Sequence, residues 1–191
     1  MKAKPLKPKP LKPKPYAHRQ LPLTIATAQT SYPSRFIPAY RVVLVKDNSL
    51  PFANDRLANS QQAQPIVKNL IETHGQSDRE QFCVLMLNTK NAIIGVNIVS
   101  TGGVSSAPVS PREVMKPAIL ANASALLLAH NHPSGEVQPS PEDLAITEQL
   151  IHAASIIGIT IHEHIIVSMF DDRYFSFADQ GIIKSMYDRI G

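Results

Sequence analysis

The chain of 191 residues contains one cysteine and no long apolar run. A single cysteine cannot form a disulfide within the chain, and Cys83 lies in an apolar segment, where a small buried side chain is its expected role. The apolar runs stay well below the roughly 20 residues that a membrane-spanning helix needs. The start of the chain also lacks the apolar centre of a secretory signal peptide. These absences favour a protein of the reducing cytoplasm that does not contact a membrane.

Acidic residues are absent from the first fifteen positions, which repeat Lys-Pro-Lys-Pro-Leu with small variations. Each proline removes a backbone donor and fixes φ, so we expect residues 1–15 to form an extended, disordered arm and no core. The lysines of this arm are Lys2, Lys4, Lys7, Lys9, Lys12 and Lys14. Without them the count of Lys and Arg falls from 19 to 13, against 15 Asp and Glu, so the net positive charge belongs to the arm.

The arm favours two roles about equally. Its lysines would hold a polyanion such as DNA through contacts that weaken steeply as salt is added. The absence of interleaved aromatic side chains argues against sequence-specific reading of nucleic acid by this segment. The other role is a solvated spacer, or a ligand for a proline-binding module.

After the arm, residues 16–57 show little periodicity and are expected to form an extended linker with one candidate edge strand over 40–45. From residue 58 to residue 191 helical and strand patterns alternate, which predicts one α/β domain with a central mixed β-sheet flanked by helices on both faces. The expected elements are a helix over 59–74, a hairpin of strands over 82–87 and 92–99, a helix over 111–121, a buried strand over 124–129, a helix over 141–157, a strand over 159–167 and a short strand over 174–177.

Two pairs of polar residues in these elements have an expected placement. Ser110 and Glu113 have the spacing of a capping box, so we expect Glu113 to cap its helix, with a catalytic role as the second interpretation. His162 and His164 stand two residues apart in a predicted strand, which would place both on one face of the sheet. We expect them to belong to the core or to support a site.

The most informative stretch runs from Ala129 to Asp143. A short apolar run ends at His130-Asn131-His132, in the manner of a strand buried on both faces. Because side chains alternate along a strand, His130 and His132 would point to one side and Asn131 to the other. Two imidazoles so placed can converge on one metal ion.

Beyond this strand the chain must turn and begin a helix. The turn residues are Pro133, Gly135 and Pro139. Ser140 is the expected N-cap, with Pro141 at the first helical position, so Asp143 falls in the first turn. Its carboxylate either interacts only with the helix dipole or, as we expect, serves as a third metal ligand and leaves a fourth position for water.

The pattern His-x-His, seven residues, Ser, two residues, Asp resembles the JAMM motif of the JAB/MPN metalloproteases. Three wider segments are similar to the RadC branch of that family, whose members are labelled DNA repair proteins. These segments are residues 82–91, Pro111-Arg112-Glu113-Val114 and Ala129-His130-Asn131-His132-Pro133-Ser134-Gly135. The resemblance covers about residues 59 to 181.

This resemblance implies the JAB/MPN fold, which is cytidine-deaminase-like, and a zinc site. His130, His132 and Asp143 match the zinc ligands of the family. Ser140 matches the serine that hydrogen-bonds near the attacking water or the oxyanion. The family motif also needs a glutamate at the start of an upstream strand, and Glu80 matches that residue.

Together these groups would suffice to hydrolyse an amide bond. Zinc held by two imidazoles and a carboxylate lowers the pKa of a bound water from 15.7 to about 7. Glu80 would act as general base and acid, and Ser140 would stabilise the oxyanion. The leading hypothesis is a zinc-dependent metallopeptidase that cleaves peptide or isopeptide bonds in a peptide or protein substrate. The same ligands would also accept iron, manganese or nickel, so zinc rests on geometry and on the resemblance.

Two departures from the family pattern keep other functions open. The Lys/Pro arm stands where full-length members usually carry a helix-hairpin-helix DNA-binding segment, and Glu163-His164 replaces the usual Asp-His pair of the late strand. The alternative is a non-catalytic, DNA-associated accessory protein that uses the arm. A third hypothesis, an HNH nuclease, is disfavoured, because the residues of that signature are dispersed over a hairpin and a helix whereas His130-Asn131-His132 are adjacent on a strand.

Overall fold

The computed structural model describes residues 45, 56–102 and 109–190. All of them belong to one compact unit of the chain, Arg41–Gly191. The Lys/Pro arm, residues 40–44 of the candidate edge strand and most of the predicted linker lie outside the described residues. Among the residues that are described, no helix is both long and apolar enough to cross a membrane.

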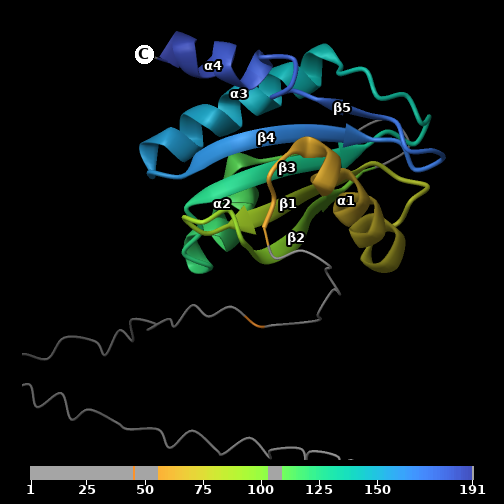
Figure 1. The fold of residues 1–191 in the computed structure, drawn as a ribbon, viewed down its shortest axis with the longest axis horizontal. Helices are drawn as coiled ribbons and strands as arrows, with labels where there is room; N and C mark the ends of the chain where they lie inside the picture. The colour runs from red at the N-terminus through yellow and green to blue at the C-terminus, as the bar shows by residue number, and fades with distance from the viewer. Residues whose placement is uncertain (1–44, 46–55, 103–108, 191) are drawn as a thin grey trace, which may run out of the picture. The chain divides into compact units, whose positions relative to one another are not determined.

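A mixed sheet of five strands forms the centre of this unit, in the order β2-β1-β3-β4-β5 (Figure 1). Strand β1 pairs antiparallel with β2 and β3, β3 pairs parallel with β4, and β4 pairs antiparallel with β5. The elements are α1 Ser60–His74, β1 Gln81–Leu87, β2 Ile93–Thr101, α2 Pro111–Leu120, β3 Ala125–Asn131, α3 Pro141–Ile156, β4 Thr160–Val167, β5 Tyr174–Ser176 and α4 Ile182–Ile190. This architecture confirms the predicted α/β class and the predicted hairpin of β1 and β2.

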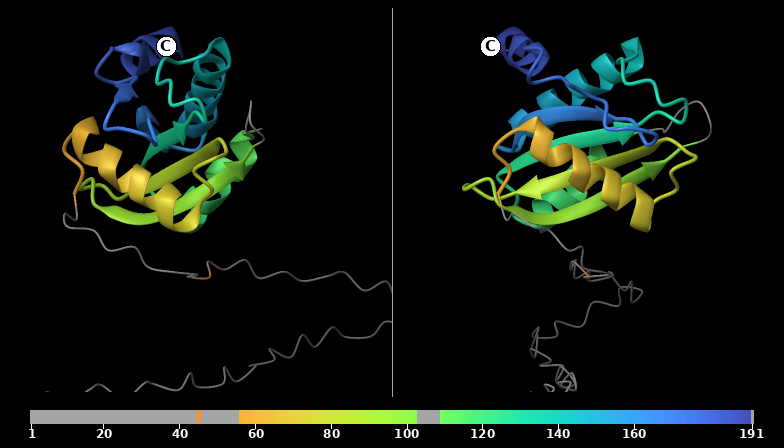
Figure 2. Two further views of the ribbon diagram at one scale, coloured as in Figure 1. Left: turned by 90° about the vertical axis from the view of Figure 1, so that its right-hand side faces the viewer. Right: turned by 45° about the vertical axis from the view of Figure 1, so that its right-hand side comes forward.

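Helices cover both faces of the sheet (Figure 2). Helix α1 packs Val67 and Ile71 into a buried cluster with Leu85 of β1. The opposite face packs against α2, α3 and α4, which contribute Val114, Leu150 and Ile183 among others to a second buried cluster. Alternate residues of β1 and β3 enter the two clusters, so both faces of the central strands are removed from water.

Helix α1 begins and ends where the sequence predicts. The Asn59 side chain accepts a hydrogen bond from the Gln62 N–H and so caps the first turn. The helix ends at His74, and Gly75 follows as its C-terminal cap. A Cβ at Gly75 would lie 2.9 Å from the carbonyl oxygen of Ile71, so this position excludes a side chain because the backbone approaches closely.

The predicted capping box at the start of α2 is wrong. Ser110 occupies the N-cap position, but its side chain makes no capping hydrogen bond. The Glu113 N–H donates instead to the backbone carbonyl of Ser110 at 3.0 Å, so the donor that the hydroxyl would satisfy is already bonded. The Glu113 side chain is exposed and pairs with Lys116 at 3.5 Å, which is a surface contact of small energetic value.

The prediction that His162 and His164 share a face of the sheet is also wrong. The register between β3 and β4 shifts, because Leu126 pairs with Ile161 whereas Leu127 pairs with Glu163. The extra residue breaks the alternation of side chains at His162. His162 is therefore exposed, whereas His164 is fully buried on the face that α3 covers.

The same shift turns Glu163 toward α1, on the face opposite the metal motif. Its buried carboxylate accepts hydrogen bonds from the hydroxyls of Ser60 and Ser176 and from the backbone N–H groups of His164 and Ala178. Four donors compensate for the burial of this carboxylate and join α1, β4 and the segment after β5. The Glu163 that departs from the family pattern therefore occupies a structural position.

Candidate metal centre

Three side chains of the predicted motif converge at the carboxyl end of β3. His130 is the last residue but one of the strand, His132 follows the strand end, and Asp143 lies in the first turn of α3. The Nε2 atoms of the two histidines lie 3.0 Å apart. Asp143 places Oδ1 at 3.2 Å from His130 Nε2 and Oδ2 at 3.4 Å from His132 Nε2. One ligand atom from each residue lies within 4.8 Å of the others, so this group could hold a metal ion.

The loop between β3 and α3 begins with a tight turn. The Gly135 N–H donates to the His132 carbonyl at 2.9 Å, and Gly135 adopts a φ of +76°, a conformation that L side chains rarely adopt. A Cβ at this position would lie 2.4 Å from a ring carbon of Phe170, which rests on the glycine. Gly135 is therefore required both for the turn and for the contact with the loop after β4.

A capping box at the start of α3 fixes the direction of the Asp143 carboxylate. The Ser140 hydroxyl accepts from the Asp143 N–H at 3.1 Å and donates to Oδ2 at 2.7 Å. The Ser140 N–H also donates to Oδ2 at 2.7 Å. The N-cap prediction is confirmed. Because the hydroxyl of Ser140 serves both the helix end and the carboxylate, its role toward an oxyanion stays a prediction.

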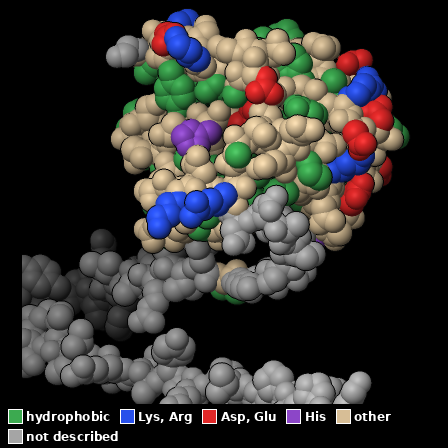
Figure 3. Space-filling model, in the orientation of Figure 1, with side chains coloured by type: hydrophobic (Ala, Val, Ile, Leu, Met, Phe, Trp, Pro, Cys, Tyr) green, Lys and Arg blue, Asp and Glu red, His purple; other side chains and the backbone are tan. Residues whose placement is uncertain are grey.

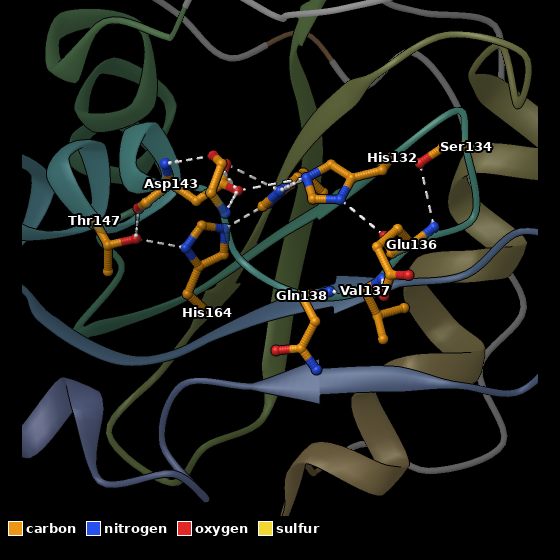
Figure 4. Close-up of polar contacts among 10 residues, drawn as sticks. His132, Ser134, Glu136, Val137, Gln138, Asp143, Thr147 and His164 are labelled. Atoms are coloured by element: carbon orange, nitrogen blue, oxygen red, sulfur yellow. Dashed lines mark hydrogen bonds and ion pairs between the residues drawn. The ribbon is translucent and has the colours of Figure 1, made fainter.

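The partner of His132 determines which of its nitrogens carries hydrogen. Its Nδ1 lies 2.8 Å from the carbonyl oxygen of Glu136, and this oxygen can only accept (Figure 4). Nδ1 therefore carries the proton and donates. In the neutral ring, Nε2 keeps its lone pair and points toward Asp143, as a metal ligand requires.

A second chain of hydrogen bonds determines the tautomer of His130. The Thr147 hydroxyl donates to the Asp143 carbonyl at 2.5 Å and so accepts from Nδ1 of His164 at 2.6 Å. Burial holds the pKa of His164 well below 6.5, so the ring is neutral and its Nε2 is an acceptor. His130 Nδ1 therefore donates to this atom at 2.8 Å, and His130 Nε2 keeps its lone pair for the site.

These tautomers make the site a fit for a cation. Two Nε2 lone pairs facing each other at 3.0 Å repel unless a proton or a metal ion lies between them. Burial raises the pKa of Asp143, but its contacts with the His130 and His132 rings, which can each carry a proton toward it, outweigh burial and hold that pKa well below its ordinary 3.8. The hydrogen bond to Asp143 raises the pKa of His132 above 6.5, against the opposing effect of burial. The carboxylate therefore stays charged and attracts whichever cation binds.

Glu80 lies beside this group without belonging to it. Phe82 pairs with His130 in the last antiparallel pair of β1 and β3, and continuing this register by two residues would bring Glu80 opposite His132 and onto the same face. The charge of Glu80 contributes to the raised pKa of His132, which indicates that the two side chains are near each other. Within the described part of the chain, the carboxylate of Glu80 makes no hydrogen bond or ion pair. Its role as the general base stays a prediction.

Sequence analysis did not identify Thr147 as a residue of the site, and it predicted for His164 only a place in the core or a supporting role. Thr147 follows Asp143 by one helical turn, so the spacing of four residues was a usable indication that both face the same strand. His164 stacks on Phe177 at 4.6 Å between ring centroids and lies behind His130 as seen from the site. Both residues orient His130 or Asp143, and neither belongs to the group that could hold a metal ion.

We expect Thr147→Val to weaken metal affinity about 10–100-fold, the usual cost of losing a partner that orients a ligating histidine. The substitution keeps the shape of the side chain but removes the acceptor for His164 Nδ1, so the tautomer of His130 is no longer fixed. Competition with a chromophoric chelator would measure the affinity. Thr73→Val is the matched control, because Thr73 donates to the carbonyl of Asn69 in the same i−4 arrangement on α1. Equal losses in both variants would contradict the interpretation.

Comparison with known proteins identifies relatives of this domain. The model of a family described as RadC-like JAB domain matches residues 57–182. A UPF0758 protein of Rubrobacter xylanophilus is 49% identical over 106 residues, which are 56% of this chain and 45% of the relative. UPF0758 proteins of Desulfitobacterium hafniense and Methanococcoides burtonii are 41% identical over 120 residues (63% of this chain, 52% of the relative) and 36% identical over 133 residues (70% and 57%). The chain thus spans about half the length of the curated relatives it matches, and their names state no activity.

Proposed function

The chain belongs to the family of RadC-like JAB domains, and we propose that it is a zinc-dependent hydrolase of peptide or isopeptide bonds. One observation carries the proposal: two imidazole lone pairs and an ionised carboxylate face one point. The hydrogen bonds of the two Nδ1 atoms, to His164 and to the Glu136 carbonyl, fix the orientation of the rings. Two imidazoles and one carboxylate are the protein ligands of zinc in several hydrolases, with the fourth position left for water or substrate.

When bound, zinc would polarise the scissile carbonyl and lower the pKa of a coordinated water to about 7. Glu80 supplies what the ligands do not, a half-buried carboxylate on the same face that can accept a proton. It would take the proton from the attacking water and pass it to the leaving nitrogen. Ser140 holds Asp143 in place, and its hydroxyl would reach a substrate oxyanion only by giving up one of its present hydrogen bonds.

The metal content of purified protein tests this proposal. We expect about one zinc per chain in wild type purified without added metal, and loss of that zinc in His132→Ala and Asp143→Ala, since each removes one of three protein ligands. Elemental mass spectrometry measures the stoichiometry. His152→Ala is the matched control, because this exposed histidine lies on α3 far along the helix from Asp143.

Zinc that persists in both ligand variants would contradict the proposed site, and iron, manganese or nickel in its place would correct the metal. Stoichiometric zinc justifies a screen of peptide and isopeptide substrates. In that screen, Asp143→Ala is the inactive reference. Hydrolysis by the wild type that is absent from this variant establishes the reaction class.

A second candidate is an accessory role on DNA, which the lysines of residues 1–15 favour. On the described surface visible in Figure 3, acidic and basic side chains are interspersed at the top and on the right, and basic side chains without acidic neighbours form only a small area at the lower left, so this face offers no extended basic area to a polyanion. Binding to DNA would therefore depend on the arm. It would disappear when residues 1–15 are removed and persist in His132→Ala, whereas hydrolysis would show the opposite pattern.

A further inference from the structure

Asn131, the residue between the two histidine ligands, is fully buried and turned away from them. Its Oδ1 accepts from the Gln81 N–H at 3.0 Å, and its Nδ2 donates to the carbonyl of Arg79 at 3.0 Å. One side-chain amide thus bonds the peptide groups on both sides of Glu80. Asn131 makes these contacts from β3, the strand that also carries His130.

The position of Glu80 depends on these backbone contacts because its side chain forms no hydrogen bond or ion pair within the described residues. The regular pairing of β1 with β3 ends at Phe82 and His130, two residues short of Glu80. The Glu80 carbonyl accepts from the Gly102 N–H at 2.8 Å, which fixes one more point of this segment. Within the described ranges its carboxylate has no hydrogen-bond or ion-pair partner. The backbone over 79–81 therefore determines where the carboxylate lies.

We propose that Asn131 is a positioning residue for Glu80, an inference that rests on the proposed hydrolase function. The side-chain amide of Asn131 connects β3 to residues 79–81 beyond the last residue pair of β1 and β3, so that Glu80 stays opposite His132. The tripeptide His130-Asn131-His132 then presents two metal ligands on one face of the strand, and Asn131, which points to the other face, fixes the backbone that carries the general base Glu80. A shift of about 1 Å at such a group can cost on the order of 10²-fold in rate.

An amide is required at this position because the side chain must accept one hydrogen bond and donate the other. Arg79 offers an acceptor and Gln81 offers a donor, and asparagine is the short side chain that satisfies both. Asn131→Asp would keep the bond to Gln81 but would place an oxygen against the carbonyl of Arg79. Asn131→Ala would lose both bonds and leave the N–H of the buried residue Gln81 without its acceptor.

The test is a double-mutant cycle on the full chain loaded with zinc. We expect Asn131→Ala to lower kcat about 10–100-fold, as removal of a supporting residue does, with zinc content unchanged and KM within twofold. In the Glu80→Gln background the same substitution should cause no further loss, because the residue through which it acts is already disabled. Asn131→Asp should fall between wild type and Asn131→Ala.

Asn88→Ala is the matched control. Asn88 Oδ1 accepts from the N–H groups of Lys90 and Ala92 at 2.9 and 3.0 Å, so it also bonds two backbone groups, at the opposite end of β1. A loss of kcat that adds fully to that of Glu80→Gln, or that Asn88→Ala reproduces, would overturn the inference and leave Asn131 a structural residue.

Hydrogen exchange supplies a readout without substrate. The Gln81 amide should exchange about 10–100-fold faster in Asn131→Ala, with or without zinc, because its acceptor is gone, and should be unchanged in Asn88→Ala. An unchanged rate in Asn131→Ala would overturn the inference on its own. Wild type that binds no zinc contradicts the proposed function and removes the inference with it, whereas zinc-loaded Asn131→Ala with full kcat overturns the inference alone.

Discussion

Replacing Glu80 with glutamine should lower kcat by about 10²–10⁴-fold, the range that general acid–base catalysis supplies, while the zinc content stays at the wild-type value. Glutamine has the size of glutamate but cannot take a proton from water. The metal should remain because the ligand group consists of His130, His132 and Asp143, and Glu80 lies outside it. Initial rates with a substrate from the peptide and isopeptide screen, measured beside the metal content, give both quantities on one preparation.

Asp78→Asn serves as the control, since this exposed acidic residue lies in the same segment, two positions before Glu80. Its rate should stay within twofold of wild type. If Glu80→Gln keeps its full rate, another group must carry the proton. If it loses zinc together with activity, Glu80 would have to be a ligand, and the three-residue group would be incomplete.

The metal motif could be predicted because one short stretch of sequence determines it locally. Alternation along a buried strand places His130 and His132 on one side, Gly135 permits the turn, and Ser140 begins the helix that brings Asp143 back. Each step depends on rules that act within a few residues. The structure therefore assembles the three side chains as the sequence predicts.

The capping box of Ser110 failed for a local reason, because the backbone carbonyl of Ser110 already accepts from the N–H of Glu113. Two other features escaped prediction because they depend on partners distant in the sequence. His162 left the predicted face because of a register shift against β3, which no pattern within β4 reveals. The contact of Asn131 with residues 79 and 81 requires the pairing of strands about 50 residues apart. Helix α4 is a different case, because the spacing of Ile183, Met186 and Ile190 was an available but unused indication.

Stripping the metal should make the stability of this domain depend on pH between 8 and 6.5, where the zinc-loaded form should respond little. With free zinc at 1,000 times its Kd, binding adds about 4 kcal/mol to the free energy of unfolding, so a chelator should lower Tm by roughly 10–15 °C. The pH response differs between the two forms because protons and zinc compete for the same nitrogen atoms.

In the metal-free form His132 determines whether the stability of the domain rises or falls with pH above 6.5. Its pKa is raised by Asp143, so its contribution to stability is fully present below 6.5 and is lost as pH rises through the folded pKa. Asp143 has a lowered pKa, so its contribution is constant at every pH well above 3.8. Stability of the metal-free form should therefore rise as pH falls from 8 to 6.5. Below 6.5 it should decline, because the unfolded chain protonates His164 and the buried ring does not.

In the zinc-loaded form the raised pKa of His132 gives no such gain. Zinc must displace the proton from His132, so its affinity should fall about tenfold for each pH unit below that pKa. This loss cancels the gain of the metal-free form, so the two curves should converge as pH falls to 6.5. Calorimetric Tm values at several pH values between 8 and 6.5, with excess zinc or with chelator, test the contrast. Asp143→Asn should behave alike with and without zinc, because this substitution removes both the ligand charge and the partner that raises the pKa of His132. If the two wild-type curves run parallel, the proton and the metal do not share His132, and the assignment of that nitrogen as a ligand is wrong.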